Sequence, residues 1–205
     1  MLDFDDYLNR LASAAPTPGG GSAAAICGAM GAALVAMVAR ITRENLKNDD
    51  RAALADACIA QGDLLRARFF EARTLDERAY GAVVEAMALP RTTEAEKNAR
   101  TAHLQDALAQ AAAAPLAAVN LGAQLLALSE RALDLENAHL ASDLGCAAEF
   151  ALAAIAASAL NVRINHKYLK NPDLVAEHMR VLEIFEREAP LGAARVRARV
   201  TAAIA

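Results

Sequence analysis

The chain has 205 residues, a formal net charge of −4, and a composition that is 56% hydrophobic but only 4% aromatic, without tryptophan. This length allows one domain with a sizeable core, and abundant alanine with few aromatic residues favours an all-α fold over a sheet. The mild negative charge, with no long block of like charge, argues against nucleic-acid binding, which needs a basic face.

The first predicted element is a short amphipathic helix over residues 3–13, with Phe4, Leu8 and Leu11 on one stripe. Prolines 16 and 18 end this helix, since proline lacks an N–H and restricts the residue before it. Three consecutive glycines then form a flexible corner. Ser22 is the candidate N-cap of the next helix, which should run to about residue 45 or 46.

An apolar run over residues 23–39 raises the question of a membrane span. Its length is near the lower limit of roughly 17–25 residues for a spanning helix. Alanine and glycine are only weakly apolar, however, and no aromatic belt flanks the run. Small residues on every face suit the central helix of a bundle, where neighbouring helices approach closely. We therefore expect a buried Ala/Gly-rich central helix and no membrane association.

The rest of the chain is predicted to consist of long helices and short breaks. We expect helices over residues 50–88, 94–113, 116–135, 142–169 and from 173 into the C-terminal region, the last interrupted at Pro190. Thr93 and Glu96 have the spacing of a capping box. No run alternates as a half-buried strand would, and no linker or repeat divides the chain. The prediction is therefore a single-domain helical bundle over residues 1–205.

The cysteines and histidines give no sign of a metal site. Cys27, Cys58 and Cys146 are scattered without a Cys-x-x-Cys pair, a pattern typical of reduced thiols in a cytoplasmic protein. The four histidines lack the spacing of metal ligands. The acidic N-terminal residues do not resemble a secretory signal. We expect a cytoplasmic protein that binds no metal.

The glycine corner, Gly19-Gly20-Gly21-Ser22, is not a phosphate-binding loop, because it lacks the Gly-Lys-Ser/Thr ending. Two interpretations stay open for it. It can be a tight corner that only glycine tolerates. It can also be a place where the backbone approaches a ligand, with the N-terminus of a helix offering free N–H groups.

Two polar sets stand out within helical segments. Asp76 and Tyr80 share a helix face with Arg73 one turn back, either as a solvated, salt-bridged surface or as part of a site. Asn161 and Asn165 lie four residues apart on an otherwise apolar helix. Buried amides need partners, so these side chains bond either the backbone or a polar heterocycle.

Several segments together resemble a known family. They are Pro16-Thr-Pro-Gly-Gly-Gly-Ser-Ala-Ala-Ala, Asp76-Glu-Arg-Ala-Tyr80, Leu89-Pro90-Arg91, Thr93-Glu-Ala-Glu-Lys with Arg100 and Gln105, Ala114-Pro115-Leu116, Asn137 with Ser142-Asp143, and Asn161-Val-Arg-Ile-Asn165. In this order they resemble the cyclodeaminase/cyclohydrolase family, which includes the C-terminal half of formimidoyltransferase-cyclodeaminase and the free-standing bacterial methenyltetrahydrofolate cyclohydrolase. The resemblance covers at least residues 4–165. Tyr80 stands where phenylalanine is common, and Glu136 and Ala138 flank Asn137 where glycine and leucine are expected.

The resemblance implies an all-helical homodimer that acts on folate-bound one-carbon units, with the catalytic aspartate at Asp76. The candidate substrate-binding residues are Pro18, Gly19, Gly20, Gly21, Ser22, Tyr80, Asn137, Ser142, Asp143, Asn161, Asn165, Arg40, Arg43 and Lys47. The corner would shape the folate cleft, and the amides with Asp143 would bond the polar edge of the pterin. The three basic residues would meet glutamate carboxylates, unless they only place favourable charge at a helix C-terminus.

The implied reactions share a tetrahedral carbon between two nitrogens. A cyclohydrolase adds water to 5,10-methenyltetrahydrofolate and yields 10-formyltetrahydrofolate; a cyclodeaminase closes formimidoyltetrahydrofolate and releases ammonia. Either needs one group to take and return a proton, which a carboxylate can do. No metal is needed, since the methenyl amidinium is already electrophilic. A non-catalytic helical interaction module is the alternative of another class. Asp76 would be kept ionised if Arg73 pairs with it, whereas a dry pocket would raise its pKa.

Overall fold

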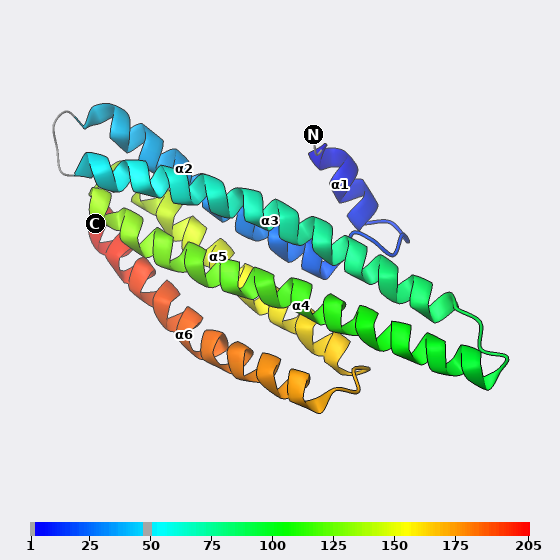
Figure 1. Ribbon diagram of the computed structural model, residues 1–205. Coiled ribbons are helices and arrows are strands. Elements are labelled where there is room, and N and C mark those ends of the chain that lie inside the picture. The colour runs from blue at the N-terminus through cyan, green and yellow to red at the C-terminus, as the bar shows by residue number, and fades with distance from the viewer. Residues whose placement is uncertain (1–2, 47–50) are drawn as a thin grey trace.

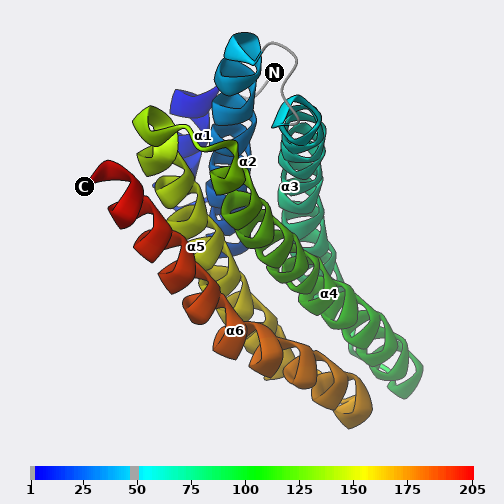
Figure 2. The ribbon, with the colours of Figure 1, turned by 90° about the vertical axis from the view of Figure 1, so that its left-hand side faces the viewer.

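The computed structural model describes residues 3–46 and 51–205, and within these ranges every regular element is helical. The elements are α1 (Phe4–Leu11), α2 (Gly20–Asn45), α3 (Arg51–Ala88), α4 (Glu94–Ala132), the 3-10 turns η1 (Leu133–Leu135) and η2 (Ala138–Leu140), α5 (Ala141–His166) and α6 (Pro172–Ile204). The predicted all-α, single-domain architecture is confirmed. The long helices run side by side, and the short α1 stands at the edge of the bundle (Figures 1 and 2).

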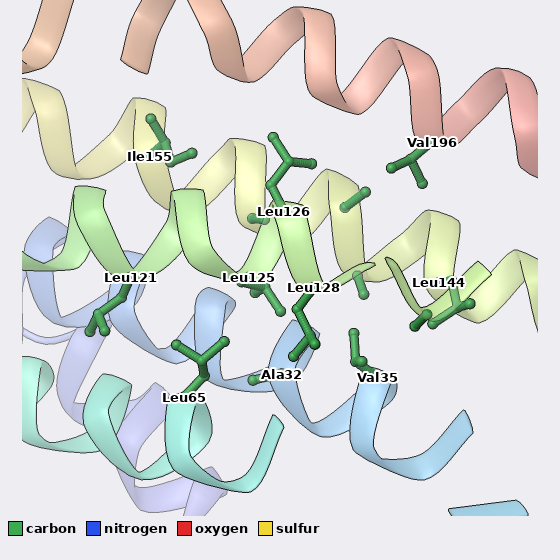
Figure 3. Close-up of a cluster of buried hydrophobic side chains, with 14 of the residues drawn as sticks. Ala32, Val35, Leu65, Leu121, Leu125, Leu126, Leu128, Leu144, Ile155 and Val196 are labelled. Atoms are coloured by element: carbon green, nitrogen blue, oxygen red, sulfur yellow. The ribbon is translucent and has the colours of Figure 1, made fainter. Parts of the chain in front are cut away.

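The helix α2 packs against α3, α5 and α4, which confirms the prediction of a buried Ala/Gly-rich helix at the centre of the bundle. Figure 3 shows Ala32 and Val35 of this helix among leucines of the neighbouring helices. Small residues permit this close packing. At Gly28, for example, a Cβ atom would come within 2.4 Å of the ring of the buried Phe69.

The helix α4 begins at the predicted capping box. The Thr93 hydroxyl accepts the Glu96 backbone N–H at 3.2 Å, and the Glu96 carboxylate accepts the Thr93 N–H at 2.8 Å. This reciprocal pair satisfies two of the N–H groups that a helix start leaves without a partner.

Two proline positions correct the sequence prediction. The helix α4 continues through the buried Pro115 instead of breaking near residue 114, and α6 continues through Pro190. A proline removes one intrahelical hydrogen bond, which costs about 3 kcal/mol in a helix interior. Along α4, packing against α3 and α5 offsets that cost, so tertiary contacts prevail over local propensity.

The start of the chain contains two further corrections. The N-cap of α2 is Gly19 rather than Ser22, which lies inside the helix with its side chain fully buried. In α1, the predicted apolar stripe does not face the core, since Phe4 and Leu8 are exposed whereas Tyr7 is buried. The Tyr7 and Ser22 hydroxyls form a hydrogen bond, 3.0 Å apart. This bond engages the Ser22 side chain, which therefore does not cap α2, and it orients α1 with Tyr7 toward α2.

Three helical segments, Gly20–Asn45, Glu94–Leu135 and Ala138–His166, are long and apolar enough to cross a membrane by length and composition. Within the chain, 67%, 56% and 44% of their most apolar windows are buried. Much of their apolar surface is therefore covered by neighbouring helices. The three cysteines are free thiols, as predicted.

Candidate active site

A pocket of about 400 Å³ opens where α2 begins, between the second half of α3, the first half of α4 and the end of α5. It is lined by Pro16, Thr17, Gly19, Gly20, Gly21, Asp76, Tyr80, Val83, Val84, Met87, Leu104, Leu108, Ala111, Asn161, Ile164, Asn165 and Tyr168. Its volume falls within the range of roughly 300–1,000 Å³ that is typical of small-molecule sites. The pocket therefore gathers the glycine corner and the polar residues of α3 and α5 in one place.

Asp76 is the only acidic residue among those lining residues, and it lies directly over the glycine corner. A Cβ atom at Gly21 would be 2.2 Å from Asp76 Oδ1, so the carboxyl group occupies the space that any side chain there would need. This position places the carboxyl at the N-terminus of α2, where free N–H groups and the helix dipole favour negative charge.

Burial raises the pKa of Asp76 above its ordinary value. A hydrogen bond from the Ser22 backbone N–H opposes this rise in pKa, whereas the neighbouring charge of Glu77 adds to it. The loss of water around the carboxyl is the largest of these effects, so the dry pocket makes Asp76 a stronger base than an exposed aspartate.

Arg73 does not pair with Asp76. Its Nη1 donates instead to Glu77 Oε1 at 3.4 Å, one helical turn further along α3. Glu77 also accepts the Ser22 hydroxyl at 2.8 Å and is not part of the pocket wall. Of the two environments considered for Asp76, the structure contains the drier pocket without the arginine partner.

The two asparagines of α5 reach the pocket from the side opposite α3. Asn161 lies over Gly20, where a Cβ atom would be 3.3 Å from its Nδ2, and it donates to the Ala157 carbonyl at 2.8 Å. Asn165 Nδ2 donates to the carbonyls of Ala111 and Asn161 at 2.8 and 2.9 Å. Bonds to backbone carbonyls thus use two donors of Asn165 and one of Asn161 and orient each amide, and their Oδ1 atoms are suited to accept from a ligand.

The remaining walls are mostly apolar, and most of these residues were not predicted. Tyr80, Val83, Val84 and Met87 follow Asp76 at intervals of four, three, one and three residues, which places them on one face of α3. Tyr80, Val84 and Met87 are nonetheless exposed, a sign of an apolar face that another molecule covers. The helical spacing of these apolar residues after Asp76 is the sequence pattern from which this wall of the pocket could have been predicted.

Two polar side chains of α4 hold the rim of the pocket from outside. Arg100 donates from Nε and Nη2 to the carbonyl of Met87, at 3.2 and 3.1 Å. Gln105 donates to the Tyr168 carbonyl at 3.1 Å and accepts the Lys170 N–H at 2.6 Å. Both residues belong to a segment that carried the family resemblance, and in the structure they fix the backbone of residues that line the pocket.

The predicted site residues divide into three groups: those that line the pocket, those buried beside it, and those that lie away from it. Gly19, Gly20, Gly21, Asp76, Tyr80, Asn161 and Asn165 line the pocket. Pro18 and Ser22 are buried beside it without lining it, and a cis peptide bond joins Thr17 to Pro18.

The other predicted binding residues are not brought to this pocket within one chain. Arg40 pairs with Asp63, and Arg43 Nε lies 3.0 Å from Asp56. Asn137 donates to the Thr42 hydroxyl at 2.9 Å, near the far end of α2. At 1.5 Å per helical residue, that end is about 30 Å from the glycine corner. Outside the pocket wall therefore lie Arg40, Arg43, Asn137, Ser142 and Asp143, and Lys47 lies outside the described residues.

Among residues 3–46 and 51–205, no group of three or more histidine, cysteine or acidic side chains is placed to hold a metal ion. The polar groups among its lining residues are the carboxylate of Asp76, two amides, the hydroxyl-bearing side chains of Thr17, Tyr80 and Tyr168, and the backbone of the glycine corner. These groups can bond a polar heterocycle and exchange a proton with it.

A half-buried carboxylate at a helix N-terminus, inside an apolar pocket of ligand size, is an arrangement typical of enzymes that bind a small organic molecule. Residues 3–183 match the formiminotransferase-cyclodeaminase family, and the chain belongs to this family. The resemblance drawn from the sequence segments is thereby confirmed.

Relatives cover most of the chain. It is 38% identical over 180 residues to a methenyltetrahydrofolate cyclohydrolase of Methylorubrum extorquens, which covers 88% of this chain and 86% of the relative. It is 34% identical over 197 residues to the formimidoyltransferase-cyclodeaminase of Sus scrofa, and there it spans only 36% of the relative's length. The crystal structure of a formiminotetrahydrofolate cyclodeaminase from Thermotoga maritima superposes with a TM-score of 0.88 at 26% identity, covering 100% of this chain and 98% of that one.

Proposed function

We propose that this enzyme hydrolyses 5,10-methenyltetrahydrofolate to 10-formyltetrahydrofolate, with Asp76 as general base and then general acid. One observation carries the proposal: the carboxyl of Asp76 lies in an apolar pocket, away from Arg73, and burial raises its pKa. The sequence identity to the Methylorubrum extorquens cyclohydrolase, and the large share of both chains that the alignment covers, support this reaction.

The substrate is a cation at the bridging carbon, and the carboxylate of Asp76 stabilises that charge. Water adds to the carbon between N5 and N10, and Asp76 takes one of its protons. The neutral hydroxyl adduct then receives this proton at N5, and the bond between carbon and N5 breaks. The protonated formyl group on N10 loses its hydroxyl proton to solvent, so that the cation and water yield 10-formyltetrahydrofolate and one proton. This exchange contributes about 10²–10⁴-fold to the rate.

In this proposal the pterin lies against the apolar walls, with its polar edge toward Asn161 and Asn165. Their Oδ1 atoms accept from ring N–H groups, and the orientation of each amide is fixed by its bonds to backbone carbonyls. The tetrahydrofolate derivative is the substrate, and the chemistry uses no metal because the amidinium carbon is already electrophilic.

Cyclodeamination of formimidoyltetrahydrofolate is the second candidate. The Sus scrofa relative and the Thermotoga maritima structure favour it, since both carry cyclodeaminase in their names. N10 would attack the formimino carbon, and Asp76 would pass a proton to the departing ammonia. The same carboxylate serves either reaction, so the pocket alone does not separate them. A non-catalytic interaction module, in contrast, does not agree with this family of enzymes.

The two reactions are separated by following methenyl absorbance with the purified protein. Supplied with 5,10-methenyltetrahydrofolate, a cyclohydrolase lowers the absorbance faster than a blank without enzyme. Supplied with formimidoyltetrahydrofolate, a cyclodeaminase raises it. The Asp76→Asn variant is the control for each assay. No change above the blank with either substrate would overturn the proposed function.

We also propose that the enzyme is a homodimer that forms along α2. The apolar residues Ala23, Cys27, Met30, Leu34, Met37 and Ile41 recur along this helix at alternating intervals of four and three residues. This spacing is that of a helix–helix seam. Met30, Met37 and Ile41 are 41%, 36% and 40% exposed in the single chain, so this face has room for a helix of a second copy.

We propose that the enzyme works in the cytoplasm and binds neither nucleic acid nor membrane. Reduced cysteines and a net charge of −4 support this setting.

A further inference from the structure

A buried hydrogen-bonded network lies behind Asp76, on the side away from the pocket. The Tyr7 and Ser22 hydroxyls are 3.0 Å apart, and the Ser22 hydroxyl donates to Glu77 Oε1 at 2.8 Å. Arg73 Nη1 reaches the same oxygen at 3.4 Å. Tyr7 and Ser22 are 2% and 0% exposed, whereas the Arg73 and Glu77 side chains are partly buried, so the network joins α1, α2 and α3 largely away from water.

The direction of these bonds follows from counting protons. A serine hydroxyl has one proton, and Ser22 donates it to Glu77. Tyr7 must therefore donate to Ser22 across their 3.0 Å contact. The chain of donors from Tyr7 through Ser22 ends on the carboxylate of Glu77, which also accepts from the guanidinium of Arg73.

None of these four side chains lines the pocket, yet the network meets Asp76 at two points. Glu77 is the next residue along α3, and its charge acts on the Asp76 carboxyl. Ser22 supplies the backbone N–H that bonds this carboxyl, and its side chain is held by Glu77 and Tyr7. The same contacts thus fix the start of α2 against α3 and hold the negative charge of Glu77 beside Asp76.

We propose that Tyr7, Ser22 and Glu77 are positioning residues that hold Asp76 at the N-terminus of α2 and set its strength as a base. This inference rests on the proposed function of Asp76. The tyrosine of α1 thereby links the start of the chain to the reaction, although it touches neither the pocket nor Asp76.

The charges around Asp76 give the sign of the effect. On α3, Glu77 raises the pKa of Asp76, and Arg73 neutralises part of that charge through its ion pair. The start of α2 contributes the Ser22 amide, which lowers this pKa. The side chain of α1 in the network is the neutral Tyr7, whereas the charged Asp5, Asp6 and Arg10 of α1 are exposed, and α5 contributes the uncharged Asn161. Removing the charge of Glu77 therefore lowers the pKa of Asp76. Removing the Ser22 hydroxyl takes away a hydrogen-bond donor that screens the charge of Glu77, and this change raises the pKa of Asp76.

The test is the pH dependence of kcat for 5,10-methenyltetrahydrofolate in wild type, Glu77→Gln and Ser22→Ala. The acidic limb should move to lower pH in Glu77→Gln and to higher pH in Ser22→Ala. A weaker base should also lower the plateau of Glu77→Gln by about 3–10-fold. Glu85→Gln is the matched control, because it removes an exposed charge from the same helix and should leave the limb in place.

A second measurement separates this inference from the proposed function. Carboxyl ¹³C chemical shifts of labelled aspartate give the pKa of Asp76 directly, with its signal assigned by its loss in Asp76→Asn. Turnover absent from wild type would overturn the proposed function, while the shifts would still test the network. An unchanged Asp76 titration in folded Glu77→Gln and Ser22→Ala would overturn the inference. Should Glu77→Gln not fold, Ser22→Ala alone decides it by the direction of its shift.

Discussion

At residue 21 the chain has no side chain, and the carboxyl of Asp76 occupies the space that a Cβ atom would take. The glycine corner thus admits a side chain from α3 to the first turn of α2. The identity of residue 21 matters here for the close approach it permits rather than for an unusual backbone angle, since none of the described glycines has a positive φ.

Gly21→Ala should displace Asp76, because its Cβ would come within 2.2 Å of Oδ1. A misplacement of about 1 Å at a reacting group costs up to about 10²-fold in rate, so turnover should fall by roughly 10–100-fold. Gly81→Ala is the control on α3, where a Cβ atom meets nothing within 4 Å. Helical circular dichroism should be unchanged in both variants. Full activity in Gly21→Ala would mean that Asp76 need not rest on the corner.

Asp76→Asn should separate catalysis from stability. The amide is nearly isosteric but cannot take a proton, so turnover should fall about 10²-fold or more with folate affinity within several-fold. Burial raises the pKa of Asp76, so the folded state binds its proton more tightly than the unfolded state. Folded stability therefore falls as pH rises from the unfolded to the folded pKa. The uncharged variant escapes this loss, and its thermal midpoint at neutral pH should be no lower than that of wild type.

The pH dependence of wild-type activity follows from the same group. Asp76 acts as a base only when ionised, and its raised pKa moves the acidic limb of kcat/KM above the range of an exposed aspartate. Initial rates on 5,10-methenyltetrahydrofolate, corrected for the uncatalysed reaction at each pH, measure this limb. A limb at or below the ordinary aspartate pKa would contradict the role of burial.

At the scale of elements, helix starts were easier to predict than helix breaks. The capping box at Thr93 is a local signal, because its two hydrogen bonds lie within four residues of sequence. The effect of Pro115 is decided by helices far away in sequence, and no local pattern reveals that α4 is packed on both sides of it. The same limit applies to α1, whose orientation depends on the partner of Tyr7 on α2.

The helix α4 also controls the pocket through Gln105, which bonds the backbone on both sides of residue 169. Gln105→Ala removes both bonds and frees the segment that carries Tyr168 over the pocket. We expect KM for 5,10-methenyltetrahydrofolate to rise several-fold with kcat nearly unchanged, because Asp76 is not disturbed.

Asn120→Ala is the control for this variant, since the Asn120 side chain bonds only the Leu116 carbonyl of its own helix among the described hydrogen bonds. Steady-state kinetics on both variants give the comparison. Equal KM values in wild type and Gln105→Ala would show that Tyr168 keeps its place without the two hydrogen bonds of Gln105.

At the scale of the whole molecule, the sequence located those parts of the site that carry unusual residues. Glycines before an apolar run, Asp76 on a helix face and paired asparagines in α5 all meet in one pocket. The apolar wall escaped prediction because valine, leucine and methionine read equally as core. Arg40 was placed in the site by its charge and Asn137 by the family resemblance, whereas in the structure both lie toward the far end of α2, Asn137 through its bond to Thr42.

Besides the pocket wall of α3, a second apolar face of the molecule, on α2, is left partly exposed in the single chain. The neighbours of this helix cover the opposite face, where Ala32 and Ala39 are fully buried. The seam from Ala23 to Ile41 runs along almost the entire helix. In water, an apolar stripe of this length favours association with an equal stripe.

A charge placed in this seam should separate the proposed dimer. A glutamate at each protomer's position 37 would face an apolar partner and its own symmetry copy, so Met37→Glu should be monomeric at micromolar concentration. Light scattering should give twice the 21.5 kDa chain mass for wild type and the single chain mass for the variant. Leu191→Glu places the same charge at an exposed apolar residue of α6, 55% exposed, and should stay dimeric. A monomeric wild type would contradict the dimer itself, and an unchanged dimer in Met37→Glu would move its interface away from α2.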